Sequence, residues 1–205
     1  MIKGTPRVKC EHCAITHAKQ VISRRASEGK SPRPFYRIAW DLFDFPEGYN
    51  GAQWLLVIKD EYSGKLFGYI LTNKSGVQVM GAVVKFDHWV KRQYGLAICK
   101  IRHDNDTSVI PSWGESAYQR WCEEEGIDLE NPPPDTKEPN GLAERAGQEA
   151  ITRSIKMRID AGLPEKLWPE TTLVAIFLYN ISPLKARGWY IPNEVLNSWF
   201  REYFR

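Results

Sequence analysis

Three acidic residues stand where separate predicted elements could bring their side chains together. Asp41 interrupts the apolar strand Trp40-Asp41-Leu42-Phe43, where an ionised carboxylate is costly to bury unless a cation compensates it. Asp104 follows a short apolar strand, the place where active-site groups usually emerge from an α/β sheet, and Glu144 lies about one turn into a predicted helix. Converging carboxylates can hold two divalent cations about 3.5–4 Å apart, one on the attacking and one on the leaving oxygen of a phosphoryl transfer.

Two of these residues also have a specific structural explanation. Asp104 could simply begin a turn, and a Glu in the first turn of a helix interacts favourably with the helix dipole. Arg145 and Lys156 lie on a polar stripe next to Glu144 on the same predicted helix, from which they could contact phosphates. Taken one at a time, the three positions leave both interpretations open.

A second possible metal site lies in the segment Cys10-Glu11-His12-Cys13, where two cysteines are separated by two residues. Two such thiolates supply half of a tetrahedral zinc site, which requires four ligands. His17 could be a third ligand, but the remaining cysteines, Cys99 and Cys122, belong to predicted core elements. We therefore predict a zinc half-site at Cys10 and Cys13. A redox role is disfavoured because no strand leads into the pair.

Positive charge is concentrated at the start of the chain. Residues 1–37 hold nine of the 28 Lys and Arg residues against two Glu, although the net charge of the whole chain is only +3. A basic segment of this kind, which includes Arg24 and Arg25, suits a polyanion such as DNA. A solvated basic tail is the alternative interpretation.

The elements that must position these residues follow from hydrophobic patterning. Residues 29–34 contain two prolines and predict a linker. Beyond them, runs of β-branched and aromatic residues over 36–43, 52–59 and 65–72 predict three antiparallel strands. The pattern then predicts helices over 75–94, 113–125, 141–159 and 164–180, with strands over 96–102 and 127–129. This order predicts an α/β, ribonuclease-H-like fold: a mixed five-stranded sheet, three antiparallel then parallel strands, flanked by helices.

Composition argues against several other classes of protein. With 42% hydrophobic and 26% charged residues over 205 positions, the chain is typical of a globular protein with one main core. The longest apolar stretch, 173–179, is much shorter than the roughly 20 residues that cross a bilayer, and the N-terminus lacks the apolar run of a signal peptide. We therefore expect neither a membrane nor a secreted protein. No Gly-x-Ser-x-Gly motif and no glycine-rich phosphate loop is present, so we expect water or a DNA 3′-hydroxyl, not a side chain, to be the nucleophile.

Several motifs resemble those of one known family. They are Trp40-Asp41-Leu42-Phe43, Arg102-His103-Asp104-Asn105, Pro139-Asn140-Gly141-Leu142-Ala143-Glu144-Arg145, Leu167-Trp168-Pro169-Glu170 with the later Ala175 and Asn180, and Pro192-Asn193-Glu194. In this order, with 62 residues between Asp41 and Asp104 and 39 between Asp104 and Glu144, the sequence resembles the integrase catalytic core of copia-type (pseudovirus) LTR retrotransposons. The resemblance spans about residues 10–200, and we expect a fungal source.

The resemblance implies a retroviral-integrase-like fold in which Asp41, Asp104 and Glu144 bind two Mg²⁺ or Mn²⁺ ions. It also implies a polynucleotidyl transferase that processes the 3′ ends of element DNA and joins them to target DNA. The implied partners are DNA and further copies of the chain, with RNA as an additional partner. The implied location is the nucleus or cytoplasmic particles of the element. The residues expected to contact DNA are Arg24, Arg25, Asn140, Arg145 and Lys156.

The same resemblance suggests a division of the chain. Residues 1–34 would be a basic arm with a linker and the remnant of an N-terminal zinc module, whose upstream His pair is absent from this sequence. Residues 35–185 would be the integrase catalytic core, and 186–205 the C-terminal tail of that core.

The sequence departs from the family at two places near the predicted site. After Asp104 it reads Asn105-Asp106-Thr107-Ser108-Val109-Ile110 instead of the usual Asn-Gly-Gly-Glu-Phe, and Glu138-Pro139 replaces Gln-Gln. The alternative is therefore a catalytically inactive, truncated or domesticated remnant that binds nucleic acid or protein. A ribonuclease H is disfavoured, because such sites generally carry an additional carboxylate.

Overall fold

The structure, a computed structural model, describes residues 31–103, 115–130, 141–185 and 188–203. The strands are β1 (Arg37–Asp44), β2 (Trp54–Asp60), β3 (Leu66–Leu71), β4 (Lys100–His103) and β5 (Asp128–Glu130). The α-helices are α2 (Gly76–Tyr94), α3 (Glu115–Glu125), α4 (Gly141–Asp160), α5 (Trp168–Ile181) and α6 (Pro192–Tyr203), with the short 3-10 helices η1 (Tyr49–Gly51) and η3 (Glu165–Leu167). Among these described residues no helix is long and apolar enough to span a membrane.

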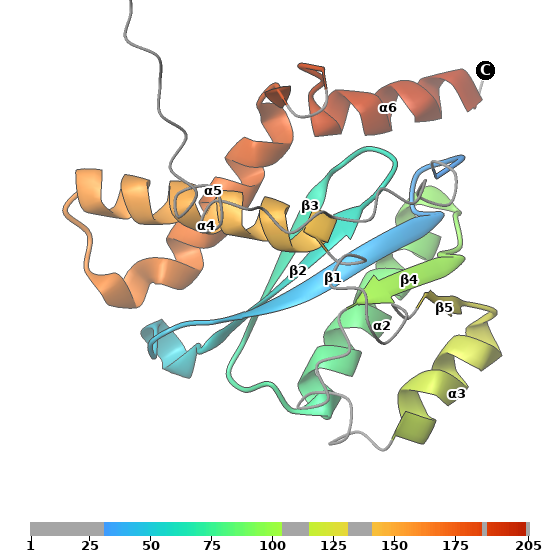
Figure 1. Ribbon diagram of the computed structural model, residues 1–205, viewed down its shortest axis with the longest axis horizontal. Coiled ribbons are helices and arrows are strands. Elements are labelled where there is room, and N and C mark those ends of the chain that lie inside the picture. Colours follow the sequence, from blue (N-terminus) through green and yellow to red (C-terminus); the bar gives the residue numbers. More distant parts are fainter. Residues whose placement is uncertain (1–30, 104–114, 131–140, 186–187, 204–205) are drawn as a thin grey trace, which may run out of the picture.

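The five strands form one sheet in the order β3-β2-β1-β4-β5. β1 pairs antiparallel with β2, and β2 with β3, whereas β4 pairs parallel with β1 and β5 parallel with β4. The predicted mixed sheet, with its antiparallel and parallel parts, is therefore confirmed. β1 lies at the centre of this sheet, so it is the strand from which a side chain can be surrounded by the other elements (Figure 1).

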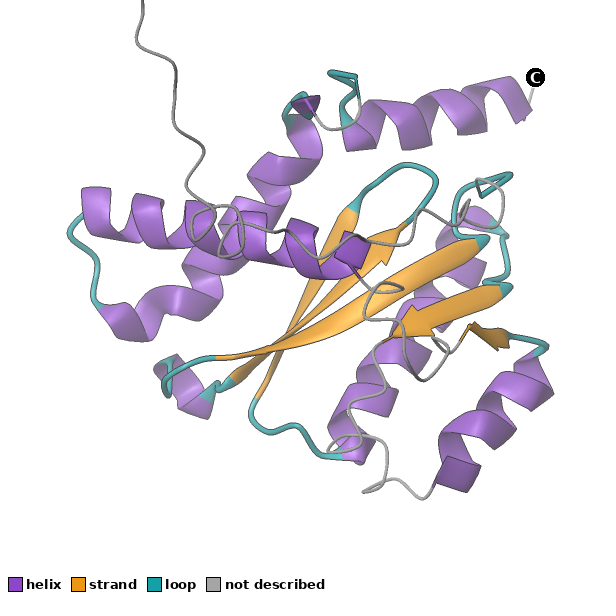
Figure 2. Ribbon diagram, viewed as in Figure 1, coloured by secondary structure: helices purple, strands orange, loops and turns teal. Residues whose placement is uncertain are grey.

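Helices cover both faces of the sheet, and each face has its own hydrophobic core (Figure 2). The strand β2 contributes to both cores, since Leu56 and Ile58 pack with α2 and α3 while Leu55 and Val57 pack with α4 and α5. Successive side chains of a strand point to opposite faces, so a strand covered on both faces reads as a continuous apolar run.

β4 is shorter than the strand predicted over 96–102, because it begins only at Lys100. Its partner explains the difference. β1 starts at Arg37, which pairs with Lys100, and the chain before β1 contains Pro34, which has no N–H to donate to a ladder. The Arg33 guanidinium instead donates a hydrogen bond to the Ala97 carbonyl at 3.0 Å.

The segment predicted as a C-terminal tail contains a helix, α6. Leu196, 1% exposed, and Phe200 lie four residues apart and pack against the core on the α2 side, where the Phe200 and Tyr94 rings are stacked 4.9 Å apart. Pro192 stands at the first position of the helix, where its missing N–H is not needed. These were sequence signals for a helix that the prediction did not include.

Candidate functional site

Asp41 lies near the middle of β1 with its side chain on the α4 face of the sheet. The neighbouring Trp40 points the other way, into the α2 side, where its ring stacks on His103 at 4.7 Å. Phe43, two residues after Asp41 and therefore on the same face, packs with the core on the α4 side. Asp41 is half-buried, and its Oδ1 accepts a hydrogen bond from the Leu42 amide at 2.9 Å.

The distance between α4 and β1 is set by a glycine. A Cβ atom on Gly147 would lie 2.5 Å from two ring atoms of Phe43, so only glycine fits the present arrangement at this position. The buried face of α4 is built from small side chains, those of Ala143, Ala146 and Ala150. Small residues let the helix backbone approach the sheet closely.

This buried face is not the one that hydrophobicity alone favours. In the sequence, the apolar residues Leu142, Ile151, Ile155 and Ile159 mark one flank of the helix. The structure buries Ile151, but it leaves Ile155 42% and Ile159 68% exposed. The residue that faces the sheet must be small wherever helix and strand are in close contact, and this requirement outweighs hydrophobicity here.

Glu144 lies in the first turn of α4, three residues before Gly147, and is exposed. α4 and β1 run in the same direction, as the sequence colours of α4 and the arrow of the parallel strand β4 show (Figure 1). Phe43 on the strand contacts Gly147 on the helix. Asp41 precedes Phe43 by two residues, and Glu144 precedes Gly147 by three residues. The two carboxylates therefore lie toward the same end of the contact between α4 and β1.

Asp104 lies outside the described residues, so the structure does not test its predicted place. β4 nevertheless ends next to the site, because its last residue, His103, pairs with Trp40. The residue before Asp104 is thus beside the residue before Asp41.

A charged network joins β1, β4 and β5 on the same face of the sheet as Asp41. Glu130 Oε1 is 2.9 Å from Arg37 Nη2 and 3.2 Å from Lys100 Nζ, and its Oε2 is 2.8 Å from Arg102 Nη2. Burial favours the neutral acid, but the hydrogen bonds from Arg37 and Lys100 and the charge of Arg102 outweigh it and hold the pKa of Glu130 below its usual range. The sequence analysis did not identify this network, which connects the strand leading to Asp104 with the strand that precedes residues 131–140.

The carboxylate oxygens of Asp41 and Glu144 suit hard divalent cations. Asp41 and Glu144 both offer carboxylate oxygens, the ligands that Mg²⁺ and Mn²⁺ prefer, and one of them is half-buried beside the exposed end of a helix. The two described members of the predicted triad therefore fit a metal site of this class.

A second group of possible ligands, Asp87, His88 and Glu125, is far from this site, on α2 and α3. A cation from the protein already occupies it, since Lys91 Nζ is 2.8 Å from Asp87 Oδ2 and also contacts Glu125. The hydrogen bonds that Lys91 donates to Asp87 and Glu125 raise the pKa of Lys91 despite the opposing effect of burial, so its ammonium stays charged. We interpret this group as an ion-pair cluster and not as a metal centre.

The remaining predicted residues divide into two sets. Arg145 and Lys156 are exposed on α4, and Arg145 Nε donates a hydrogen bond to the Gly141 carbonyl at 2.6 Å. The others lie outside the described residues: Cys10, Cys13, Arg24, Arg25 and Asn140. Nothing in the structure bears on the zinc half-site or the basic arm.

Two residues of the family-like motifs have structural roles. The Trp168 indole at the start of α5 donates to the Pro46 carbonyl at 2.9 Å and stacks on Phe45 with ring centroids 4.1 Å apart. Asn180 makes two hydrogen bonds of 2.8 Å with the backbone of Leu66, one as donor and one as acceptor. These contacts fix both ends of α5 against the sheet.

Comparisons with known proteins agree with this architecture. No family model matches the chain. It is similar to the retrovirus-related Pol polyprotein from transposon TNT 1-94 of Nicotiana tabacum, with 28% identity over 94% of this chain and 14% of the polyprotein. It is also similar to the retrovirus-related Pol polyprotein from transposon RE1 of Arabidopsis thaliana, with 24% identity over 86% of this chain and 12% of the polyprotein. The chain thus spans about an eighth of the length of these relatives.

Among solved structures, the chain is similar to the integrase catalytic core domain of HTLV-2 in complex with magnesium, in a trimeric form. The TM-score is 0.58 at 16% identity, and the match covers 80% of this chain and 97% of that domain. The fold is therefore that of a retroviral integrase catalytic core. The predicted resemblance to the integrase core of copia-type retrotransposons is confirmed, whereas the fungal source is not supported, because these relatives come from plants.

Proposed function

We propose that this chain is the catalytic core segment of a retrotransposon integrase, a polynucleotidyl transferase that processes the 3′ ends of element DNA and joins them to target DNA. The observation that carries the proposal is the convergence of Asp41 and Glu144 toward one end of the contact between β1 and α4, next to the end of β4. The similarity to Pol polyproteins along nearly the whole chain supports it.

In this proposal Asp41, Asp104 and Glu144 hold two Mg²⁺ or Mn²⁺ ions. When bound, such ions activate the attacking oxygen and stabilise the leaving oxygen of the phosphoryl transfer. The protein's part is to keep its carboxylates in place: Asp41 is fixed by the central strand, and Glu144 by the close contact of α4 with Phe43. Asp104 would complete the set from the end of β4.

DNA would bind along α4 and the basic arm. Arg145 and Lys156 are exposed on the helix that carries Glu144. Arg145 is next to Glu144, and Lys156 lies about three turns further along, so a duplex lying along α4 would meet both. Arg24, Arg25 and Asn140 would add contacts, the two arginines from the arm. Contacts of this kind position the duplex and give affinity without reading its sequence, and they weaken with salt.

A second copy of the chain would pack on α5. Leu173, Val174, Phe177, Leu178 and Ile181 recur on one side of this helix and are 37–59% exposed. A contiguous apolar face of this kind usually marks an interface. The HTLV-2 domain described above has been determined in trimeric and dimeric forms, which supports a homo-oligomer here. Joining to host DNA would require the assembly to reach the nucleus.

The test is strand transfer by the purified chain on a labelled duplex that mimics an element end, with Mg²⁺, Mn²⁺ or EDTA. Asp41→Asn and Glu144→Gln should lower the rate by about a thousandfold or more, because each removes a charge that holds the metals. Salt-dependent DNA binding should be retained. Glu149→Gln, an exposed position on the same helix, is the matched control and should leave transfer intact.

Two outcomes would contradict the proposal. Transfer that survives in both site variants would remove the assigned carboxylates from the mechanism. A folded chain that binds DNA but forms no product with either metal would favour the inactive remnant.

A further inference from the structure

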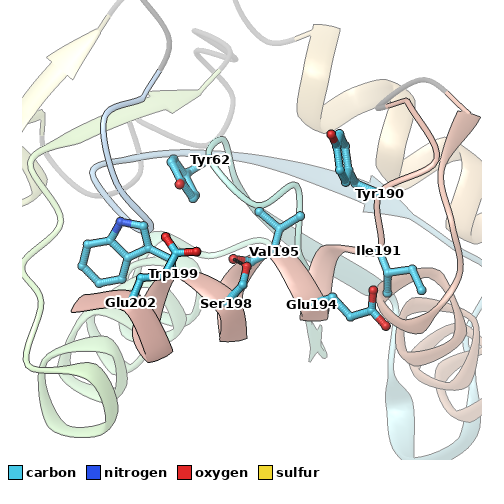
Figure 3. A pocket seen from close by; sticks show the side chains of 8 residues that line it. All are labelled: Tyr62, Tyr190, Ile191, Glu194, Val195, Ser198, Trp199 and Glu202. Carbon is cyan, nitrogen blue, oxygen red and sulfur yellow. Dashed lines mark hydrogen bonds between the residues drawn. The ribbon is translucent and has the colours of Figure 1, made fainter. Parts of the chain in front are cut away.

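A groove of about 460 Å³ runs along α6, on a part of the molecule that the proposed function does not use. Its walls carry three aromatic side chains, and two carboxylates lie along it (Figure 3). Tyr62, from the turn between β2 and β3, lies across the groove from the helix. The other lining residues are Tyr190, Ile191, Glu194, Val195, Ser198, Trp199 and Glu202.

The polar residues of the groove lie along one face of α6. Glu194, Ser198 and Glu202 are spaced four residues apart, so they lie on one face of α6, and all three are exposed. Within the described part of the chain, no Lys or Arg lies within salt-bridge distance of either carboxylate. The groove therefore presents two negative charges without a counter-ion from the described residues.

Aromatic rings and carboxylates together are the chemistry that binds cationic side chains. A guanidinium or ammonium group is attracted to the face of Trp or Tyr and at the same time pairs with a nearby carboxylate. The side-chain stems of Lys and Arg also cover apolar surface such as that of Val195 and Ile191. This combination suits a basic peptide better than a neutral or acidic one.

We propose that this groove binds Lys and Arg side chains of the basic arm, residues 1–30, of the same chain. The arm carries seven Lys and Arg residues and two Glu, so its charge is complementary to that of the groove. It is covalently attached, which gives it a high effective concentration at any surface within reach.

The described chain begins close to the groove. The Phe35 ring lies 4.9 Å from the Tyr94 ring, which in turn lies 4.9 Å from the ring of Phe200. Phe200 contacts the groove residue Trp199, with ring centroids 5.0 Å apart. Two ring contacts therefore separate the point where the arm joins the core from α6. A segment of 30 residues can span many times this distance.

The groove is separate from the proposed catalytic site, because α6 carries none of the triad. Binding of the arm to the groove would nevertheless affect DNA binding. The cations of the arm cannot pair with Glu194 and Glu202 and with phosphates at once, so DNA and the groove compete for the arm.

Zero-length cross-linking of the intact chain tests the contact directly. A carbodiimide joins a carboxylate to a lysine amine only where the two touch, and mass spectrometry identifies the joined residues. At low salt we expect Glu194 or Glu202 to be coupled to Lys3, Lys9, Lys19 or Lys30, and this coupling to disappear in 0.5 M NaCl. Mixing isotope-labelled and unlabelled chains distinguishes coupling within one chain from coupling between two.

Trypsin cleavage after Arg24 and Arg25 supplies a second readout. In the native chain at low salt, cleavage should be about five- to tenfold slower than in the double variant Glu194→Gln, Glu202→Gln, in which the arm is released. The matched control is the double variant Glu123→Gln, Glu124→Gln, which replaces two exposed carboxylates on α3. Trypsin should cleave its arm at the wild-type rate.

Three results would overturn the proposal. They are equal cleavage rates in the wild type and the groove variant, arm lysines that couple to Glu123 or Glu124 as readily as to the groove, and cross-links that join labelled to unlabelled chains.

Discussion

Replacing Gly147 by alanine has two opposing effects, because it favours the helical conformation of α4 but creates a clash between α4 and β1. In a solvent-facing helix this change stabilises a protein by about 0.5–1 kcal/mol, because glycine loses more backbone entropy on folding. At Gly147, however, the new methyl group would lie 2.5 Å from the Phe43 ring, with Val57 3.5 Å away behind it. Overpacking of this kind costs about 1–3 kcal/mol.

Gly81 provides the matched control, since it lies inside α2 and an added Cβ there meets no atom within 4 Å. We therefore expect Gly81→Ala to be more stable than the wild type, and Gly147→Ala to be less stable than Gly81→Ala by about 1–3 kcal/mol. For a chain of this size that corresponds to a difference in melting temperature of roughly 2–12 °C. Urea unfolding at pH 7 gives the free energies.

Gly147→Ala should lower the rate of strand transfer in addition to the free energy of unfolding. To relieve the contact, α4 must move away from β1 and carry Glu144 with it, so strand transfer should fall even where the variant is fully folded. Shortening the opposing side chain, in the double variant Gly147→Ala with Phe43→Leu, should restore part of both losses. A Gly147→Ala protein as stable and as active as Gly81→Ala would refute the close contact as the feature that positions α4.

Three further outcomes follow from the contacts described above. Asn180→Leu leaves the N–H and C=O of Leu66 without their partner and should lower the free energy of unfolding by about 2–4 kcal/mol in urea titrations, whereas a loss below 0.5 kcal/mol would contradict the role of the amide. Glu130 has a lowered pKa in the folded state, so its contribution to the free energy of unfolding is present above pH 4.5 and is lost as the pH falls below that value. The wild type should therefore be more stable than Glu130→Gln by about 1–3 kcal/mol at pH 7, and urea titrations should show this difference shrinking toward pH 3. Burial raises the pKa of Cys122 to about 12, so at pH 8 iodoacetamide should alkylate Cys122 about a hundredfold or more slowly than Cys99, as peptide mass spectrometry would show.

The antiparallel part of the sheet is predictable because β1, β2 and β3 are long and largely apolar runs. The strand β2 packs on both faces, so its continuous hydrophobicity identifies it without any knowledge of its partners. The end of α2 is equally clear, since Gly95 adopts the left-handed conformation, with φ of 65°, that the sequence position of a terminating glycine predicts.

Two differences between the predicted and the observed elements come from tertiary contacts. The length of β4 depends on where its partner β1 begins, which the residues of β4 do not encode. The buried face of α4 is made largely of alanine and glycine, with Ile151 and Ser154, while exposed Ile155 and Ile159 dominate its hydrophobic pattern. α6 is a different case, because the helical spacing of Leu196 and Phe200 and the preceding Pro192 already indicate a helix from the sequence.

The assignment of Asp41, Asp104 and Glu144 to one site stays a prediction, to which the structure adds the placement of two of them. Asp41 stood out as a charge within an apolar strand, and the structure places Glu144 toward the same end of the contact between α4 and β1. The place of Asp104 stays a prediction, since it lies outside the described residues. Gly147 could have been suspected from the run of small residues around it, but its contact with Phe43 requires the packing of the helix on the sheet.

The interface between α4 and α5 contains a buried cluster of hydroxyl groups. Ser154 on α4 lies 2.9 Å from both Thr171 and Thr172 on α5, and all three side chains are at most 8% exposed. Sliding one helix along the other would break these hydrogen bonds where no water can replace them, so the two helices move as a unit. The position of Glu144 on α4 is therefore tied to the way α5 sits against the sheet.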